Sequence, residues 1–293
     1  MSPWDIVLLA LLALIAVQLT LPTIQRQRRR RRRRAALRHV EAARGSRVIT
    51  LIHRQETISV LGFPFRRFID IEDSEQILRA IRLTPSEMAI DLIVHTPGGL
   101  VLASDQIAAA LRRHEGRVTV MVPHYAMSGG TLVALAADQI LMDRDAVLGP
   151  VDPQLGSLPG GFYPAASIIS AAETPNPNRN DQTLILADMA RKAIAQMHDT
   201  VFDLVSRGRP AEEAEQLATA LTEGRWTHDF PIGHDQALAL GLPVSDKLPA
   251  DVHALMDLYP QAGQRRPSVE FIPIPYRTPA PASPPRSRLW EEE

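Results

Sequence analysis

Residues 89–104 have the sequence AIDLIVHTPGGLVLAS. The run AIDLIVHT (89–96) is nearly all apolar, ends at Pro97, Gly98 and Gly99, and is followed by a helical pattern over residues 100–114. A short apolar run bounded by turn residues is typical of a strand buried on both faces, as in parallel sheets. This stretch therefore predicts a strand, a glycine turn and a helix within an α/β sheet.

The same order of strand and helix recurs along the middle of the chain. VITLIHR (48–54), RVTVMVP (117–123) and QILMD (139–143) predict further strands. Further helices are predicted over residues 74–83, 128–137, 181–206, 210–221, 235–240 and 250–258. Alternating strands and helices favour an α/β domain with largely parallel strands, which we place at residues 48–260.

The composition excludes several kinds of chemistry. The 293 residues include no cysteine, so disulfides, thiolate metal sites, iron–sulfur clusters and a cysteine nucleophile are ruled out. The sequence has no HExxH, P-loop or GxGxxG motif, and its nine histidines lack a metal-ligand spacing. We therefore expect no metal and no cofactor, and a nucleophile that is an oxygen or a nitrogen.

The N-terminus has the pattern of a membrane anchor. Residues 6–24 (IVLLALLALIAVQLTLPTI) carry no charge, and about 19 helical residues at roughly 1.5 Å each nearly match a ~30 Å hydrocarbon core. Asp5 precedes this run and arginines follow it, which is the reverse of a cleaved signal peptide. We expect residues 1–25 to form one transmembrane helix, with the N-terminus outside and the rest of the chain in the cytoplasm.

Charge is distributed unevenly along the chain. Arg26 and Arg28–Arg34 form an arginine block, yet the formal net charge is −1, so the remainder is acidic. Beside an apolar span, this block, in a predicted juxtamembrane linker at residues 26–47, is expected to contact anionic lipid headgroups; non-specific binding of nucleic acid phosphates is the alternative. Residues 261–293 are rich in proline and predict a disordered tail.

Ser128 is the candidate nucleophile. In PHYAMSGGTLVALAA (123–137) it lies where a predicted strand gives way to a helix, followed by Gly129 and Gly130. The glycines would let a substrate backbone approach, and free N–H groups at the helix start would meet an oxyanion. The alternative is that Ser128 only caps the helix, since serine is a favoured N-cap residue.

A second glycine turn supports the site. Gly98 and Gly99 also lie at a strand-to-helix junction. Parallel strands present their C-terminal ends at one edge of the sheet, so both turns are expected to open onto the same crevice. Gly98 and Gly99 would then share an oxyanion hole with Gly129.

A serine nucleophile needs a general base, and one candidate is Lys192. The chain has only two lysines, and Lys247 lies in a turn-like segment. Lys192 has a helical spacing with Ile185, Met189 and Gln196, whereas Asp188 and Arg191 are expected to point elsewhere. A lysine in an apolar stripe is favoured in its neutral form, as a base requires; reaching out to solvent is the alternative.

Histidine offers a different base. The segment GRWTHDFPIGHDQ (224–236) holds His228, Asp229 and His234, so a Ser–His–Asp arrangement with His228 or His234 is possible. His124 lies only four residues before Ser128 and is expected to shape the loop.

Three segments in order, HTPGG, AMSGGTLVALAADQILMDRDAVLGPVDPQ and EGRWTHDFPIGHDQALALGLPV, resemble membrane-anchored serine peptidases related to signal peptide peptidase A. In particular they resemble the serine dehydrogenase proteinase family, of the Clp protease/crotonase superfamily. The resemblance covers residues 48–259. It implies a ββα spiral fold, Ser128 as the nucleophile, and Gly98, Gly99 and Gly129 around the oxyanion hole.

The resemblance leaves two bases open. In relatives of signal peptide peptidase the base is a lysine on a downstream helix, which Lys192 matches, whereas the serine dehydrogenase proteinase family is described with a Ser–His–Asp triad, which His228 and Asp229 would supply. We favour Lys192. The resemblance also implies a homo-oligomer.

The expected function is therefore a membrane-anchored serine endopeptidase that cleaves peptides or membrane-associated proteins through an acyl-enzyme. Two alternatives come from other classes: a non-catalytic membrane scaffold of the same fold, and a crotonase-like acyl-CoA enzyme.

Overall fold

The computed structural model describes residues 3–54, 58–60, 63–65, 68–157 and 161–259. A five-stranded sheet in the order β1-β4-β5-β7-β12 has only parallel pairs, which confirms the predicted α/β class. Its strands are β1 (Arg47–Ile52), β4 (Ile90–His95), β5 (Val118–Val122), β7 (Gln139–Met142) and β12 (Val244–Ser245).

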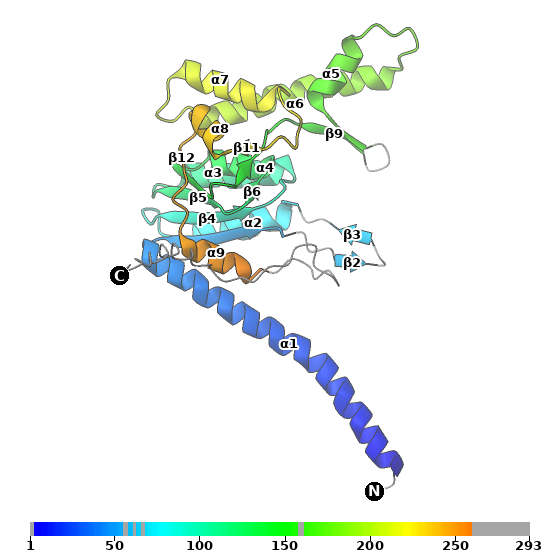
Figure 1. Cartoon of the computed structure of the whole chain (residues 1–293). Coiled ribbons are helices and arrows are strands. Elements are labelled where there is room, and N and C mark those ends of the chain that lie inside the picture. The colour runs from blue at the N-terminus through cyan, green and yellow to red at the C-terminus, as the bar shows by residue number, and fades with distance from the viewer. Residues whose placement is uncertain (1–2, 55–57, 61–62, 66–67, 158–160, 260–293) are drawn as a thin grey trace, which may run out of the picture. The chain divides into compact units, whose positions relative to one another are not determined.

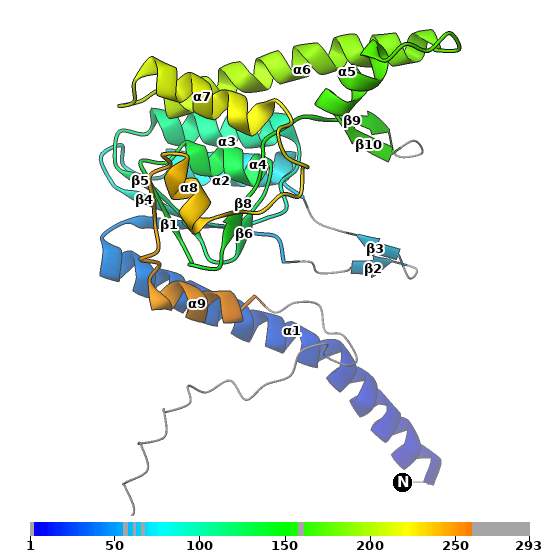
Figure 2. The ribbon, with the colours of Figure 1, turned by 45° about the horizontal axis from the view of Figure 1, so that its top comes forward.

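Helices cover both faces of this sheet (Figures 1 and 2). Leu92 belongs to the larger core and its neighbour Ile93 to the smaller core on the other face. Both are fully buried, so β4 is buried on both faces, as predicted. The larger core includes residues of α2 (Ile71–Arg82), α3 (Val101–Arg113), α4 (Gly129–Leu135), α6 (Asp181–Val205), α7 (Ala211–Thr222) and α8 (His234–Ala239). The smaller core includes residues of α1 (Pro3–Arg44) and α9 (Ala250–Asp257).

Several short elements lie in segments that the sequence left as loops. A second sheet has the order β11-β8-β6, with β6 (Tyr125–Ala126) parallel to β8 (Val147–Leu148), and β11 (Ile232–Gly233) antiparallel to β8. Three further elements and a hairpin complete the described chain: β9 (Gln154–Ser157), β10 (Gly161–Pro164), α5 (Ala165–Glu173), and β2 (Ile58–Val60) with β3 (Phe63–Phe65).

Most of the predicted linker at residues 26–47 is helical. Helix α1 continues through the arginine block to Arg44, because arginine, alanine and leucine are good helix formers and no glycine interrupts them before Gly45. Gly45 has φ 64°, a conformation that ends helices. The Arg44 guanidinium then binds the buried carboxylate of Asp91 in β4, which ties this helix to the sheet.

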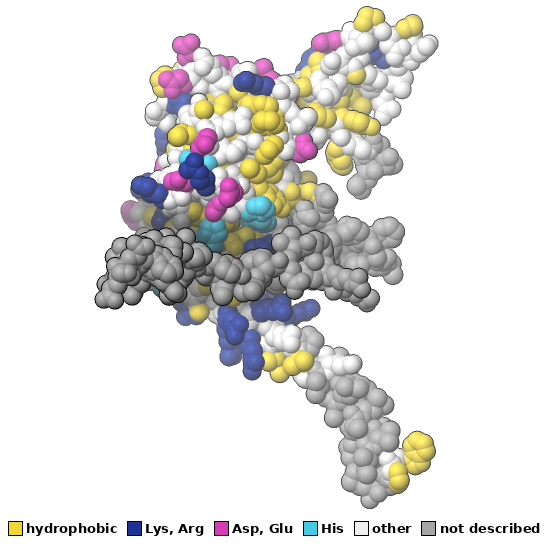
Figure 3. Space-filling view, in the orientation of Figure 1, with side chains coloured by type: hydrophobic (Ala, Val, Ile, Leu, Met, Phe, Trp, Pro, Cys, Tyr) yellow, Lys and Arg dark blue, Asp and Glu magenta, His cyan; other side chains and the backbone are white. Residues whose placement is uncertain are grey.

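Among the residues that the structure describes, no helix has a stretch long and apolar enough to cross a membrane. Most side chains of the predicted span, residues 6–24, lie outside that set, and so does the predicted tail at 261–293. The arginine block is mostly exposed, and dark blue side chains gather on this part of α1 in Figure 3.

Candidate active site

The two glycine turns meet at Ser128. Thr96, just beyond β4, pairs with Ala126 of β6: the Thr96 N–H donates to Tyr125 (3.1 Å) and the Met127 N–H donates to Thr96 (3.0 Å). A methyl group placed on Gly98 would lie 2.8 Å from Cβ of Ser128. The turns predicted from two separate strands therefore lie against each other.

The backbone of Ser128 is unusual. Its φ of 50° and ψ of −118° make it the one non-glycine residue with positive φ in the described part of the chain. This conformation costs about 1–3 kcal/mol for a residue with a Cβ and is found where a side chain must be aimed. Ser128 is the N-cap residue of α4, but its hydroxyl makes no capping hydrogen bond. Its side chain therefore does not serve as a helix cap, which was the alternative.

Two backbone N–H groups are available beside this serine. Within the described ranges, neither Gly99 nor Gly129 donates its N–H to a protein acceptor, whereas the Gly98 N–H donates to Oγ1 of Thr96 (3.2 Å). A methyl group on Gly129 would lie 3.5 Å from the Gly99 nitrogen, so the two free donors are close. Of the three glycines predicted to surround an oxyanion, Gly99 and Gly129 have the free donors.

The structure pairs His228 with Asp152. Nδ1 of His228 lies 2.7 Å from Oδ1 of Asp152, and the Gln154 side-chain N–H donates to the other carboxylate oxygen (2.7 Å). The Asp152 side chain is 2% exposed, whereas Asp229 is on the surface. This corrects the predicted pairing with Asp229: the next residue in the chain faces solvent, and a buried carboxylate from another loop contacts the imidazole.

Strand pairing brings Ser128, Asp152 and His228 to the same end of the small sheet. Ala126 and Ile232 both pair with Leu148. Ser128 lies two residues after the parallel strand β6, and Asp152 lies four residues after β8, so both leave the sheet at the same end. His228 lies four residues before β11. Because β11 is antiparallel to β8, the residues before it lie at that same end. His234, the other candidate base, lies beyond the opposite end, and its Nδ1 contacts Asp235 (3.0 Å).

A strained serine, two free N–H donors and a histidine held by a buried carboxylate are the parts of acyl-transfer chemistry. The family described as ClpP-like SDH-type serine proteinase matches residues 2–284. The chain belongs to this family. The resemblance noted in the sequence is thereby confirmed, and the parallel α/β sheet is that of a ClpP-like fold.

Relatives of this chain include two uncharacterized proteins of Methanocaldococcus jannaschii. One is 53% identical over 240 residues, covering 82% of this chain and 80% of its own length. The other is 53% identical over 257 residues, covering 87% and 88%. Among solved structures, a mutant of the 1510-N membrane-bound stomatin-specific protease is similar at 22% identity and a TM-score of 0.43, over 65% of this chain and 79% of that one. A second mutant of that protease, in complex with a substrate peptide, is similar at 22% identity and a TM-score of 0.43, over 62% and 72%.

Lys192 is on the surface of this family member. Its side chain is 69% exposed, and its Nζ lies 2.6 Å from Oδ2 of Asp188, which was expected to point elsewhere. Ile185 and Met189 of the predicted apolar stripe are also exposed. The buried residues of α6 are all apolar, and they include the small Ala187 and Ala190, which let neighbouring helices pack closely.

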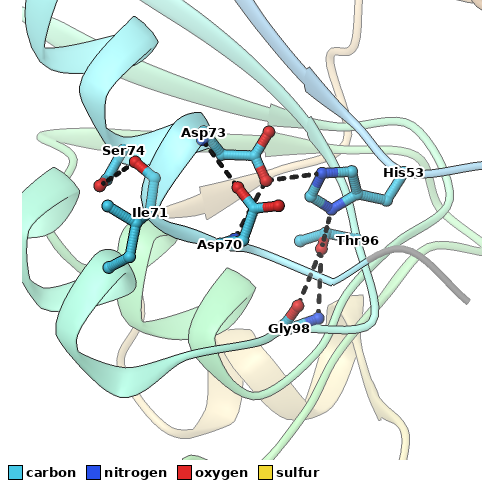
Figure 4. A network of polar contacts seen from close by, with 7 residues as sticks. All are labelled: His53, Asp70, Ile71, Asp73, Ser74, Thr96 and Gly98. Carbon is cyan, nitrogen blue, oxygen red and sulfur yellow. Dashed lines mark hydrogen bonds and ion pairs between the residues drawn. The ribbon is translucent and has the colours of Figure 1, made fainter.

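Sequence reasoning missed Asp152, Thr96 and His53. Asp152 follows a two-residue strand, which is too short to show a periodic pattern, and lies in the loop sequence GPVDPQ. Thr96 and His53 are buried behind the Gly98 turn, where Nδ1 of His53 lies 2.9 Å from Oγ1 of Thr96 (Figure 4). Within the described residues no cluster of three or more histidine and acidic side chains is arranged to hold a metal ion.

Proposed function

We propose that this SDH-type family member is a serine endopeptidase with Ser128 as nucleophile. The observation that carries the proposal is the strained backbone of Ser128, a residue that makes no capping hydrogen bond, adjoins Gly129 and lies against the Gly98–Gly99 turn. Backbone strain at a serine is typical of positions where the direction of the side chain matters for function. The same arrangement would suit other acyl transfers, and the family assignment favours peptide bonds.

His228 is the base that the geometry supports. Asp152 holds Nδ1 of the imidazole, which leaves Nε2 as the acceptor for the Ser128 proton. The strand register supports this role, because it carries both side chains to one end of the small sheet. Lys192, favoured on sequence grounds, is exposed and its Nζ contacts Asp188, so we propose it as a surface residue instead.

The reaction then proceeds in two balanced halves. Nε2 of His228 takes the hydroxyl proton as Oγ of Ser128 attacks the substrate carbonyl carbon. The resulting oxyanion accepts hydrogen bonds from the N–H groups of Gly99 and Gly129. The C–N bond breaks, the leaving amine takes the proton from His228, and an acyl-enzyme remains. Water, deprotonated by His228, attacks the ester, and Ser128 regains its proton as the carboxylic acid product leaves.

We further propose that residues 6–24 anchor the chain in a membrane, with the arginine block and the catalytic domain on the cytoplasmic side and substrates among peptides or membrane-associated proteins. The absence of charge in the run and the exposed arginines after it support this topology. A homo-oligomer is expected from the resemblance alone. Alkaline carbonate extraction of cell membranes tests the anchor: the full chain should stay in the pellet, and release into the supernatant would contradict it.

The catalytic proposal is tested with a serine-reactive fluorophosphonate on the purified full chain. Wild-type protein should be labelled and should cleave a quenched-fluorescence peptide library, and Ser128→Ala should do neither. Ser86→Ala, at an exposed serine away from the glycine turns, is the matched control and should behave like wild type. Folded wild-type protein that is not labelled would favour the scaffold, and labelling that persists in Ser128→Ala would remove the assigned nucleophile. Retention of acyl-CoA without peptide cleavage would favour the crotonase-like alternative.

A further inference from the structure

The Thr96 hydroxyl, which is buried behind the glycine turn, contacts both the N–H and the carbonyl group of Gly98. Oγ1 of fully buried Thr96 accepts the Gly98 N–H (3.2 Å) and lies 3.4 Å from the Gly98 carbonyl oxygen (Figure 4). The Ile69 N–H donates to the same carbonyl oxygen (2.7 Å). Gly98 is therefore held from behind by one side chain and one backbone group.

Holding the Gly98 carbonyl oxygen also aims the Gly99 N–H. The two groups belong to one planar trans peptide unit, in which C=O and N–H point in opposite directions. With the carbonyl oxygen held by the Ile69 N–H and the Gly98 N–H held by Oγ1 of Thr96, the Gly99 N–H is directed to the other side, where Gly129 and Ser128 lie. The direction of one proposed oxyanion donor thus depends on the Thr96 hydroxyl.

His53 in turn holds Thr96. Its ring is 4% exposed, with Nδ1 2.9 Å from Oγ1 of Thr96 and Nε2 3.1 Å from Oδ2 of Asp73. Asp73 is itself fixed by Asp70, because the two form the capping box at the start of α2. Burial opposes the charge on Asp73, but hydrogen bonds from His53 and from the Asp70 N–H lower the pKa of this carboxyl, so it remains a firm acceptor for the ring.

We propose that His53, oriented by Asp73, is a positioning residue that holds the Thr96 hydroxyl and so aims the Gly99 N–H at the oxyanion. This inference rests on the proposed acyl transfer at Ser128 and extends it to residues that touch no substrate. The role is confined to the transition state, because the carbonyl oxygen needs a well-directed donor most when it carries charge. Losing the direction of the Gly99 N–H should lower kcat and leave KM nearly unchanged.

Two pairs of variants separate positioning from stability. Thr96→Val removes the hydroxyl at nearly constant shape, whereas Thr96→Ser keeps it. His53→Gln places its amide near Nε2 and keeps the contact with Asp73, whereas His53→Asn places its amide near Nδ1 and keeps the contact with Thr96. His198→Gln is the control for loss of a half-buried histidine paired with a carboxylate, since His198 contacts Glu215 (3.3 Å) between α6 and α7.

Each variant of the full chain is measured for kcat, KM and the urea midpoint. Loss of one oxyanion donor typically costs about 10²–10³-fold in kcat, so misdirecting one should cost about 10–100-fold in Thr96→Val and His53→Gln. Thr96→Ser and His53→Asn should recover most of kcat, and His198→Gln should keep it whatever its midpoint. Equal kcat in Thr96→Val and Thr96→Ser, or in both His53 variants, would overturn the inference.

The failure of this inference differs from that of the proposed function. An unlabelled, inactive wild-type protein would contradict the role of Ser128 itself. A labelled, active wild type with unchanged kcat in Thr96→Val contradicts only the positioning role of His53. If a His53 variant does not fold, the two Thr96 variants decide the question alone, because valine removes the hydroxyl and serine keeps it.

Discussion

Nδ1 of His228 lies 2.7 Å from Oδ1 of Asp152, a residue 76 positions earlier in the chain. The carboxylate is buried and its other oxygen is occupied by Gln154, so the imidazole has one fixed orientation. Together with Ser128, the residues of the proposed site follow one another along the chain in the order serine, aspartate, histidine. The small sheet, in which β11 runs antiparallel to β8 and β6 runs parallel to it, carries the three residues to one end.

Asp152→Asn should reduce kcat by about 10²–10⁴-fold, because an amide in place of the carboxylate no longer fixes the tautomer of His228 or stabilises its charged form. Steady-state cleavage of a peptide substrate measures the effect. Asp229→Asn is the matched control at the exposed neighbour and should retain activity. A larger loss in Asp229→Asn than in Asp152→Asn would restore the pairing predicted from the sequence.

His228→Ala and Lys192→Ala distinguish the two bases. The histidine variant should lose peptidase activity and most fluorophosphonate labelling, because it removes the proposed acceptor of the Ser128 proton. The lysine variant should keep both, since its ammonium is exposed and paired with Asp188 at 2.6 Å. Loss of activity only in Lys192→Ala would reverse the assignment.

Gly98→Ala should abolish activity, because the new methyl group would lie 2.8 Å from Cβ of Ser128 and because φ of 104° is strained for alanine. Gly45→Ala is a matched control: its φ of 64° is also positive, but nothing lies within 4 Å of the new methyl group. Both variants should lose about 1 kcal/mol of stability from the backbone alone. Kinetics and urea unfolding on both proteins separate the crowding of the serine from the backbone cost.

The stability of the domain should fall in mild acid because of His95. Burial, followed by the charges of Arg54, His124 and His53, lowers the pKa of His95 from 6.5 to about 4. Above pH 6.5 the ring is neutral in both states; as the pH falls from 6.5 to about 4, only the unfolded chain takes up the proton, which favours unfolding. This should cost about 2 kcal/mol between about pH 7.5 and about pH 5.

The measurement for His95 is the urea midpoint at the two pH values, in wild type and in His95→Gln. The glutamine does not titrate, so this variant should lose much less stability on acidification. His39→Gln, at a histidine with 70% side-chain exposure, is the control and should retain the wild-type dependence. An unchanged acid dependence in His95→Gln would show that other groups cause it.

Arg44→Met should destabilise the domain by about 3 kcal/mol, because it leaves the Asp91 carboxylate buried without its cation. Arg47→Met is the control, since Arg47 is 44% exposed and lies 3.7 Å from Glu41, a pairing worth about 1 kcal/mol or less. Chemical denaturation measures both. Equal losses in the two variants would mean that Ser46, whose hydroxyl donates to Asp91 at 2.5 Å, suffices to hold the charge.

Much of the fold follows from local patterns in the sequence. The apolar run at 89–96 is a fully buried strand, and the helix predicted at 181–206 occupies 181–205. These elements are long enough for their hydrophobic periodicity to specify them. Ser128 and the turns at Gly98 and Gly129 were located for the same reason, since each lies at a junction between two well-marked elements.

The sequence by itself therefore determined the parallel α/β sheet, its helices and the residues at the ends of its strands. Only the tertiary structure decided which carboxylate meets His228, because the pairing depends on three strands of two residues each, which carry no readable period. It also decided which face of α6 is buried: close packing selects the small Ala187 and Ala190, and Lys192 is left in solvent. Contacts between distant segments are set by such packing, which no local pattern contains.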